Sequence, residues 1–210
     1  MIDIIDFHTH RLDATRALIS VDPRQFDPQP GKWYSVGYHP WQDLAALTED
    51  DFALLDSCAR HDQVLAIGET GMDTLRGSDL KTQAQVLLRH LQLAESLGKP
   101  TVIHSVRTAQ NILSVRNKAG LNTVLLAIHG FRGNQHVAQL LLNAGCYLSY
   151  GLQFNSEALL ATPLDRLLIE TDDGHTPIGE VASRIASVLG ITPHDVETLA
   201  ERNAGTLLNP

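Results

Sequence analysis

Cysteine and aromatic residues are scarce in this sequence. Its 210 residues include only two cysteines, and aromatic residues make up 5% of the chain. Two cysteines, Cys58 and Cys146, cannot supply the thiolate cluster of a structural zinc site. One falls in a helical pattern and the other at the start of an apolar run, so we expect two buried free thiols in a reducing compartment.

Long apolar runs and a basic leader are also lacking. No uninterrupted apolar run approaches the roughly 20 residues that are needed to cross a bilayer. The first six residues, Met-Ile-Asp-Ile-Ile-Asp, carry two acids in place of the basic start of a secretory signal. We therefore expect a cytoplasmic protein without membrane attachment, and no feature of the sequence indicates an obligate protein partner.

Positive charge is in deficit, because 16 Lys and Arg face 24 Asp and Glu and leave a net charge of -8. This balance argues against a protein that coats nucleic acid by bulk attraction, so any nucleic acid would have to be held locally. Histidine, in contrast, is plentiful, with ten residues. If the chain binds a metal, we expect imidazole and carboxylate ligands.

Short apolar and β-branched runs recur along the chain and predict eight strands, at residues 2–7, 17–21, 33–38, 64–67, 101–103, 123–128, 147–150 and 167–169. Helical patterns separate the later runs. The clearest spans residues 80–97, with apolar positions three or four apart and with Gly98 directly after it. Thr48 and Thr192 are each followed three positions later by an aspartate, which is typical of a helix N-cap.

Strands that alternate with helices imply parallel βαβ units, and eight of them predict an α/β fold, the (β/α)8 TIM barrel. Only residues 11–16 separate the first two strands, which is too short for a parallel crossover helix. We therefore expect a barrel trimmed near the N-terminus, with its first helix missing and an irregular loop at residues 22–32. No repeat or linker divides residues 1–210, so a single domain is predicted. An open doubly wound sheet is the alternative.

Side chains of metal-ligand type follow five of the predicted strands. His8 and His10 follow the first, and their spacing of two places both imidazoles on one face of the strand. The others are Glu69, His104, His129 and Asp172. Because the carboxyl ends of barrel strands meet at one face, we expect these six side chains to converge.

Six ligands are too many for one catalytic zinc ion, which keeps about three protein ligands, but they suit two divalent ions bridged by a carboxylate. Glu69 is the expected bridge. We assign His8, His10 and Asp172 to one ion, and His104 and His129 to the other. Imidazole with carboxylate suits zinc, manganese or iron and, less readily, magnesium, so the expected cofactors are two divalent ions: Mg, Mn or Zn.

At this point the chain resembles the TatD family of metal-dependent deoxyribonucleases, within the amidohydrolase superfamily, as a short divergent member. The motifs Gly68-Glu69-x-Gly71-x-Asp73 and Glu170-Thr171-Asp172 are the most specific to that family. The matching segments run in family order across nearly the whole chain, and they are residues 6–10, 36–40, 67–73, 100–105, 129–133 and 163–172.

The resemblance implies a hydrolase that cleaves phosphodiester bonds at DNA ends, with DNA that is single-stranded or has accessible 3′ ends as its substrate. It implies the six metal ligands already named, Asp172 and Glu69 as catalytic residues, and Asp172 as the acceptor of a proton from the attacking water. Four residues are expected to contact phosphate or base: His39, Arg107, Arg132 and His175. Trp41 could stack a base or cover the core.

Two other functions stay open. Relatives in the superfamily hydrolyse amides or lactones, and several of them bridge their metals with a carboxylated lysine. The fourth strand here carries Glu69 and no lysine, which favours phosphoesters. The third possibility is a metal-binding module without turnover.

Two acidic residues lie close to the expected ligands in sequence. Asp6 and Glu170 each precede a ligand by two residues, so they either orient an imidazole or form surface contacts. The histidines that lie in or beside helices are expected on the surface, namely His61, His90, His136 and His194.

Overall fold

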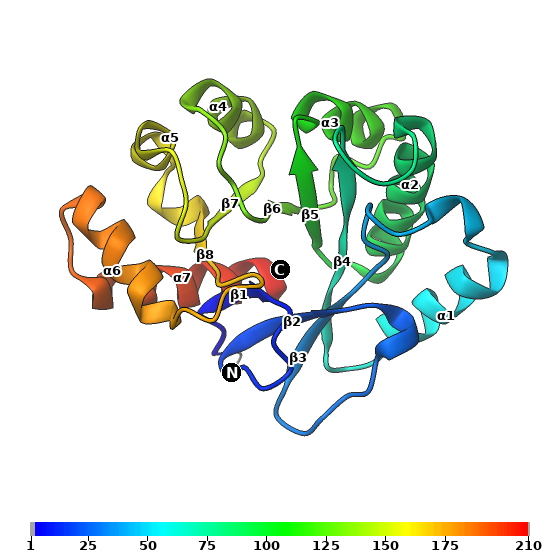
Figure 1. Ribbon diagram of the computed structural model, residues 1–210, viewed down its shortest axis with the longest axis horizontal. Helices are drawn as coiled ribbons and strands as arrows, with labels where there is room; N and C mark the ends of the chain where they lie inside the picture. Colours follow the sequence, from blue (N-terminus) through cyan, green and yellow to red (C-terminus); the bar gives the residue numbers. More distant parts are fainter. Residues whose placement is uncertain (1–2, 210) are drawn as a thin grey trace. The chain divides into compact units, whose positions relative to one another are not determined.

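The computed structural model describes residues 3–209 and confirms the predicted α/β barrel. Within that range, parallel strands follow the order β1 to β8 of a closed barrel (Figure 1). Their bounds are β1 (Asp6–Thr9), β2 (Ala17–Val21), β3 (Trp33–Val36), β4 (Val64–Asp73), β5 (Thr101–Val106), β6 (Leu126–Ile128), β7 (Tyr147–Tyr150) and β8 (Leu167–Ile169).

The helices are α1 (Glu49–Ala59), α2 (Leu80–Leu97), α3 (Ala109–Lys118), α4 (Gln135–Asn143), α5 (Ser156–Ala161), α6 (Ile178–Leu189) and α7 (Pro193–Leu208). Three short 3-10 helices complete the set: η1 (Pro23–Gln25), η2 (Leu44–Ala46) and η3 (Leu164–Arg166). As predicted, no α-helix separates β1 from β2 in the described chain, and the loop at residues 22–32 contains only η1. None of the helices in residues 3–209 is both long and apolar enough to span a membrane.

Several predicted strand boundaries were wrong. β1 begins at Asp6 rather than at residue 2, and Ile2 lies outside the described residues. β4 continues to Asp73, because its pairing with β5 extends from Ile67 as far as Asp73 opposite Val106. The apolar run stops where buried polar side chains begin, although the backbone pairing goes on. Glu69 and His104 therefore lie inside β4 and β5 and do not follow them.

The described chain folds as two compact units. The terminal unit comprises residues 3–19 and 127–209, and the central unit is Ser20–Leu126. The single domain expected for residues 1–210 stays a prediction.

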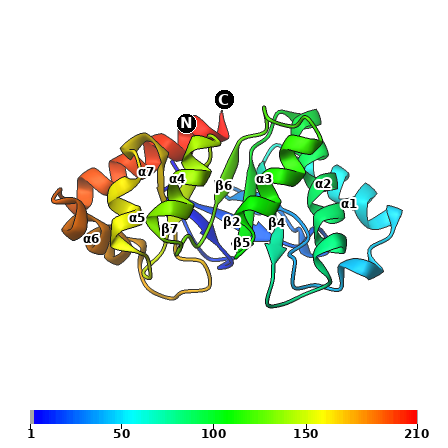
Figure 2. The ribbon, with the colours of Figure 1, turned by 90° about the horizontal axis from the view of Figure 1, so that it is seen from above.

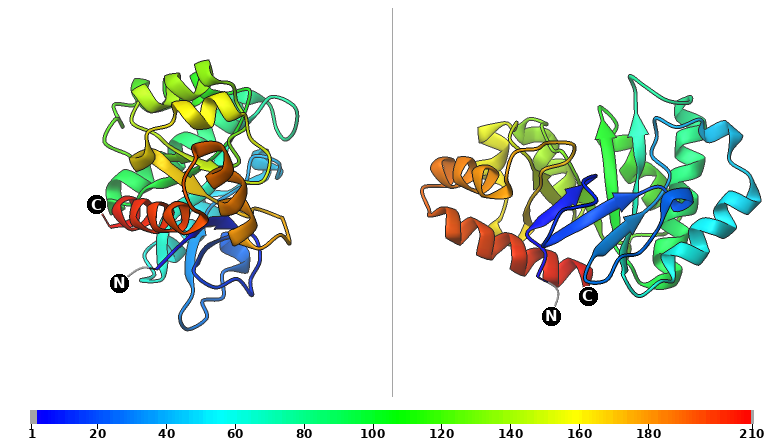
Figure 3. Two further views of the ribbon diagram at one scale, coloured as in Figure 1. Left: turned by 90° about the vertical axis from the view of Figure 1, so that its left-hand side faces the viewer. Right: turned by 60° about the horizontal axis from the view of Figure 1, so that its bottom comes forward.

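The terminal unit is built around β1, β7 and β8, and its last two helices lie side by side (Figure 3). The Thr192 hydroxyl accepts from the Asp195 backbone N–H and the Asp195 carboxylate accepts from that of Thr192, which completes the predicted capping box of α7. The buried Asn203 side chain on α7 donates to the carbonyls of Leu164 and Leu167, both at 2.7 Å. These bonds fix α7 to the start of β8.

The central unit packs α2 against β4, with α3 beside α2 (Figure 2). α2 spans the predicted residues, begins at the N-cap Asp79 and ends at Gly98, whose φ of 64° is the left-handed conformation that stops a helix. Its apolar face is buried, including Leu87, Leu91 and Ala94. The Thr48 capping box likewise starts α1 as predicted.

His90 corrects the surface assignment of the helix histidines. Its side chain is completely buried on α2, where Nε2 accepts from the Tyr38 backbone N–H at 3.0 Å and Nδ1 lies 2.8 Å from the Val86 carbonyl oxygen. Position 90 lies three residues after Leu87 and four before Ala94, so helical periodicity places it on the buried face. His61, His136 and His194 are exposed as expected.

Neither cysteine forms a disulfide within residues 3–209. Cys146 is buried as predicted, but Cys58 on α1 is only half-buried, because it lies at the edge of the buried face of that helix.

Candidate metal centre

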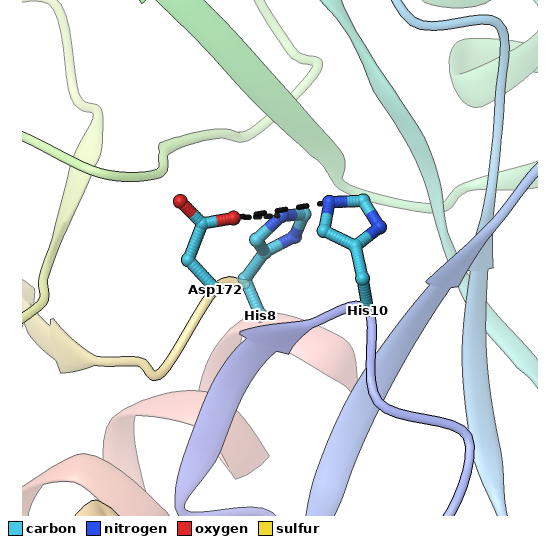
Figure 4. A group of neighbouring side chains, drawn as sticks. All are labelled: His8, His10 and Asp172. Atoms are coloured by element: carbon cyan, nitrogen blue, oxygen red, sulfur yellow. Dashed lines mark ion pairs between the residues drawn. The ribbon is translucent and has the colours of Figure 1, made fainter. Parts of the chain in front are cut away.

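The terminal unit brings His8, His10 and Asp172 together (Figure 4). The Nε2 atoms of His8 and His10 lie 3.7 Å and 3.8 Å from the same oxygen of Asp172, Oδ1. His8 is fully buried, whereas 38% of the His10 side chain and 32% of the Asp172 side chain are exposed. The cluster therefore has a closed side and a side open to solvent.

Backbone bonds between β1 and the segment after β8 place Asp172 at this position. The Asp172 N–H donates to the His8 carbonyl at 2.9 Å, and the His10 N–H donates to the Asp172 carbonyl at 3.3 Å. The Thr9 hydroxyl also donates to that carbonyl. Asp172 has a φ of 54°, a left-handed conformation that Asp and Asn adopt more readily than most residues.

His129 and Glu170 form a second group with Asp172 in the same unit. The Glu170 carboxylate is buried, accepts from the Gly130 N–H at 2.6 Å and lies 3.4 Å from His129 Nδ1. Burial raises the pKa of Glu170, but the hydrogen bond with His129 and the charges of nearby imidazoles lower it below its usual value. Glu170 is therefore ionised and orients an imidazole, which was one of its two expected roles.

Asp6 takes neither expected role. Its buried carboxylate accepts from the Thr171 N–H at 2.9 Å and from the Thr171 hydroxyl at 2.6 Å. Burial raises the pKa of Asp6 to about 7 despite these two bonds. Asp6 thus fixes the backbone just before Asp172 rather than an imidazole or a surface cation.

The central unit has a cluster of its own, in which Glu69 joins two imidazoles. Its Oε1 lies 2.9 Å from His39 Nε2 and 3.0 Å from His104 Nδ1. Two glycines of the sequence motif allow β4 to carry Glu69 this close to β5. A Cβ at Gly68 would lie 2.3 Å from the Val102 carbonyl oxygen, and one at Gly71 would lie 2.0 Å from that of His104.

Asp73 holds the far side of His104. Its Oδ2 lies 3.3 Å from His104 Nε2 and accepts from the Trp41 indole N–H at 2.6 Å. Burial raises the pKa of Asp73, but the hydrogen bonds from Trp41, Leu75 and His104 outweigh it and lower the pKa below its ordinary value. The ionised carboxylate therefore fixes the imidazole with Nδ1 directed at Glu69, as carboxylates do for metal-binding histidines.

The donor set fits a divalent cation. In each of three groups, one ligand atom per residue lies within 4.8 Å of the others, and these groups are His8, His10 and Asp172; His129, Glu170 and Asp172; and His39, Glu69 and His104. All six predicted ligands belong to one of them. Two of the groups, His8 with His10 and Asp172 and His39 with Glu69 and His104, offer two imidazoles and one carboxylate, a set that suits zinc or manganese better than magnesium.

The residues that were expected to bind substrate are placed very differently from one another. His39 lies among the ligands rather than at the rim. Arg107 and His175 are exposed and make no side-chain hydrogen bond or ion pair within residues 3–209, and Arg132 donates to Gln153 at 3.2 Å. Within residues 3–209, no hydrogen bond or ion pair joins any of these three side chains to the ligand group of its own unit.

Sequence reasoning placed His39 among the substrate contacts and missed it as a member of a ligand group. His39 follows a predicted strand, at residues 33–38, just as the six chosen residues do, so the same rule could have found it. No spacing rule distinguishes Asp73, since its role depends on the extension of β4.

Comparison with known proteins agrees with the barrel fold and with a metal-dependent hydrolase. A family model described as TatD related DNase matches residues 26–209. The chain is 28% identical to YabD of Bacillus subtilis, named as an uncharacterised metal-dependent hydrolase, over 94% of this chain and 83% of that protein. It is 32% identical to mouse TATDN3, named for a suspected deoxyribonuclease activity, over 80% of this chain and 66% of that protein.

Several other relatives are matched over little more than half of their own length. Among solved structures, the Escherichia coli TatD homologue YJJV superposes with a TM-score of 0.85 at 20% identity over the whole of both chains. At that identity the likeness supports the fold alone.

Proposed function

The chain belongs to the family of TatD-related DNases, and on that premise we propose that this metal-dependent hydrolase cleaves phosphodiester bonds at DNA ends. The observation that supports the proposal most is the grouping of imidazoles and carboxylates in each unit, which includes all six residues named from the sequence. The substrate would be DNA that is single-stranded or has accessible 3′ ends.

We assign two divalent ions, Mg, Mn or Zn, to these groups. His8, His10 and Asp172 would hold one ion in the terminal unit, and His39, Glu69 and His104 would hold the other in the central unit. The assignment of His129 to the second ion, and of Glu69 as the bridge, stays a prediction. When bound, divalent ions neutralise charge on the phosphate and lower the pKa of the attacking water.

Asp172 is the proposed proton acceptor. Its carboxylate is 32% exposed, so water can reach it, and its backbone is tied to β1 by three hydrogen bonds that do not involve the carboxylate. Glu69 is the second proposed catalytic residue, because its buried carboxylate can share an ion with two imidazoles. Glu170 and Asp73 act as positioning residues. Glu170 contacts Nδ1 of His129 and Asp73 contacts Nε2 of His104, so each carboxylate leaves the other ring nitrogen of its histidine to bind an ion.

The first experiment tests the reaction. The purified protein is stripped of metal, reloaded with magnesium, manganese or zinc, and given end-labelled single-stranded DNA. The proposal expects shortening from one end that requires metal. Activity on an amide or lactone in place of DNA would favour the carbon-centred alternative, and two bound ions with no turnover on any substrate would favour the metal-binding module.

A second experiment tests Asp172. Asn also tolerates the left-handed backbone of this position, so Asp172→Asn keeps the local fold while it removes a strong proton acceptor. We expect kcat on DNA to fall by about 10² to 10⁴, while much of the metal binding remains. The exposed neighbour provides the control, because Asp173→Asn removes the same charge one residue away and should leave kcat near the wild-type value. Wild-type activity of Asp172→Asn would contradict the assigned role.

A further inference from the structure

An arginine and a tryptophan stack next to the ligand group of the central unit. Trp41 follows β3 and is 46% exposed, and the Arg76 guanidinium carbon lies 4.6 Å from the centre of its ring. Arg76 is exposed in the segment between β4 and α2. A large aromatic side chain left exposed beside a polar site is unusual for a residue that serves only the core.

The exposed ring is held in place by the ligand group itself. The indole N–H donates to Asp73 at 2.6 Å, and Asp73 in turn bonds His104. The Trp41 ring also lies edge-on to His39 and His104, with centroids 4.8 Å and 5.3 Å away. Trp41 is thus a fixed surface within van der Waals reach of two candidate metal ligands.

The segment that carries Arg76 is fixed as well. The fully buried Gln83 amide donates to the carbonyls of Asp73, Arg76 and Ser78 at 3.1, 3.0 and 2.6 Å, and its oxygen accepts from the Asp73 N–H at 2.7 Å. A Cβ at Gly77 would lie 1.9 Å from the Pro40 carbonyl oxygen, so this segment packs directly against the residue before Trp41.

The charge of Arg76 is not neutralised. Arg24 and Arg89 of the same unit also lie over aromatic rings, but Asp51 pairs with Arg24 and Glu49 pairs with Arg89. No carboxylate of residues 3–209 forms an ion pair with Arg76. In a chain with a net charge of -8, this cation beside an imidazole and carboxylate group offers a binding site to an anion.

We propose that Arg76 and Trp41 bind one nucleotide of the substrate strand, with the guanidinium on its phosphate and the indole against its base. This inference rests on the proposed function, because it assumes that the substrate is a nucleic acid strand. Arginine binds phosphate in a bidentate manner, and an aromatic ring stacks any base without sequence preference. The pair would hold the strand next to the ligand group without the help of a basic surface.

The charge is tested with Arg76→Ala and, as a matched control, Arg89→Ala, which removes an arginine that is already neutralised by Glu49. We expect Arg76→Ala to raise KM for single-stranded DNA about tenfold with kcat little changed. The slope of log Kd against log salt should also fall by about 0.7, the value for one phosphate contact on a single strand. A purely structural role would not change that slope, and Arg76→Lys should retain it.

The ring is tested by the binding of a labelled oligonucleotide to the manganese-loaded Asp172→Asn protein, in which fluorescence anisotropy reports affinity without cleavage. Trp41→Ala should weaken binding about tenfold with the salt slope unchanged, and Trp41→Phe should keep most of the affinity. With an abasic oligonucleotide, Trp41→Ala should bind as tightly as its parent. An equal loss on both oligonucleotides would overturn the stacking role.

The two proposals fail in different ways. If the wild-type chain binds DNA with the expected Arg76 dependence but never cleaves it, the proposed function fails and the nucleotide site stands. If it cleaves DNA and Arg76→Ala matches Arg89→Ala in KM and salt slope, the nucleotide site fails and the nuclease stands. If no single-stranded DNA binds at all, both are wrong.

Discussion

His90 is a single residue whose protonation the central unit resists. Complete burial lowers its pKa from 6.5 to about 4, although the Val86 carbonyl partly offsets this. The unfolded chain therefore binds more protons than the folded chain between these two values, so stability falls as the pH drops through this window. A shift of this size corresponds to about 2 to 3 kcal/mol at pH 4.5.

We expect His90→Gln to lose this part of the pH dependence, because a neutral amide can accept from the Tyr38 N–H but does not titrate. Urea unfolding at pH 7 and at pH 4.5 measures it: the difference in unfolding free energy between the two pH values should shrink by about 2 to 3 kcal/mol. His61→Gln, at an exposed position, is the control. An unchanged difference in His90→Gln would mean that the buried imidazole protonates freely.

The candidate ligands could be predicted residue by residue because parallel strands impose a common rule on where polar side chains gather. That rule found His8, His129 and Asp172 without knowledge of any contact. The same rule could not find Arg76. The Arg76 backbone is positioned by a hydrogen bond to its carbonyl from the Gln83 amide, seven residues further along the chain, and no periodicity in the sequence indicates that bond.

At the scale of elements, the segment between β4 and α2 depends on one side chain. The Gln83 amide forms four hydrogen bonds to backbone groups of residues 73–78. Gln83→Met has a similar shape but would leave these groups without their partner, at a cost of about 2 to 4 kcal/mol. We expect that loss in urea unfolding, together with faster protease cleavage within residues 74–78.

Gln85→Met provides the matched control, because it makes the same change two residues away on the exposed face of α2. It should leave both the unfolding free energy and the cleavage rate near the wild-type values. Equal stability of the two variants would show that the segment holds its shape without the Gln83 amide.

Helix boundaries were more predictable than strand boundaries in this chain. The ends of α2 and the starts of α1 and α7 depend on local chemistry, namely N-cap side chains and the left-handed Gly98, which is visible in a few adjacent residues. The ends of β4 and β5 depend on pairing with each other. Buried polar residues such as Glu69 interrupt the apolar pattern there but not the ladder, so the prediction ended too early.

For the whole molecule, the net charge of -8 includes carboxylates that would face cations, and two divalent ions would change the formal sum to -8 + 4 = -4. Each candidate ligand group is already assembled in its folded unit, whereas each group combines residues from distant parts of the sequence, such as His8 with Asp172, that are not held together in the unfolded chain. Ions should therefore bind the folded state preferentially. At a free ion concentration of 100 times Kd, binding at one site stabilises the folded chain by about 2.7 kcal/mol. This raises Tm by roughly 5 to 11 °C for a chain of this size.

Paired variants determine whether each unit holds its own ion. His8→Ala with His10→Ala removes two ligands of the terminal unit, and His39→Ala with His104→Ala removes two of the central unit. After loading and desalting, elemental analysis should find two ions per wild-type chain and one in each double variant. The rise in Tm on adding manganese should be smaller in both double variants than in the wild type. The rise is compared, and not Tm itself, because truncating buried side chains lowers Tm even without metal. Complete loss of metal from either double variant would contradict two independently held ions.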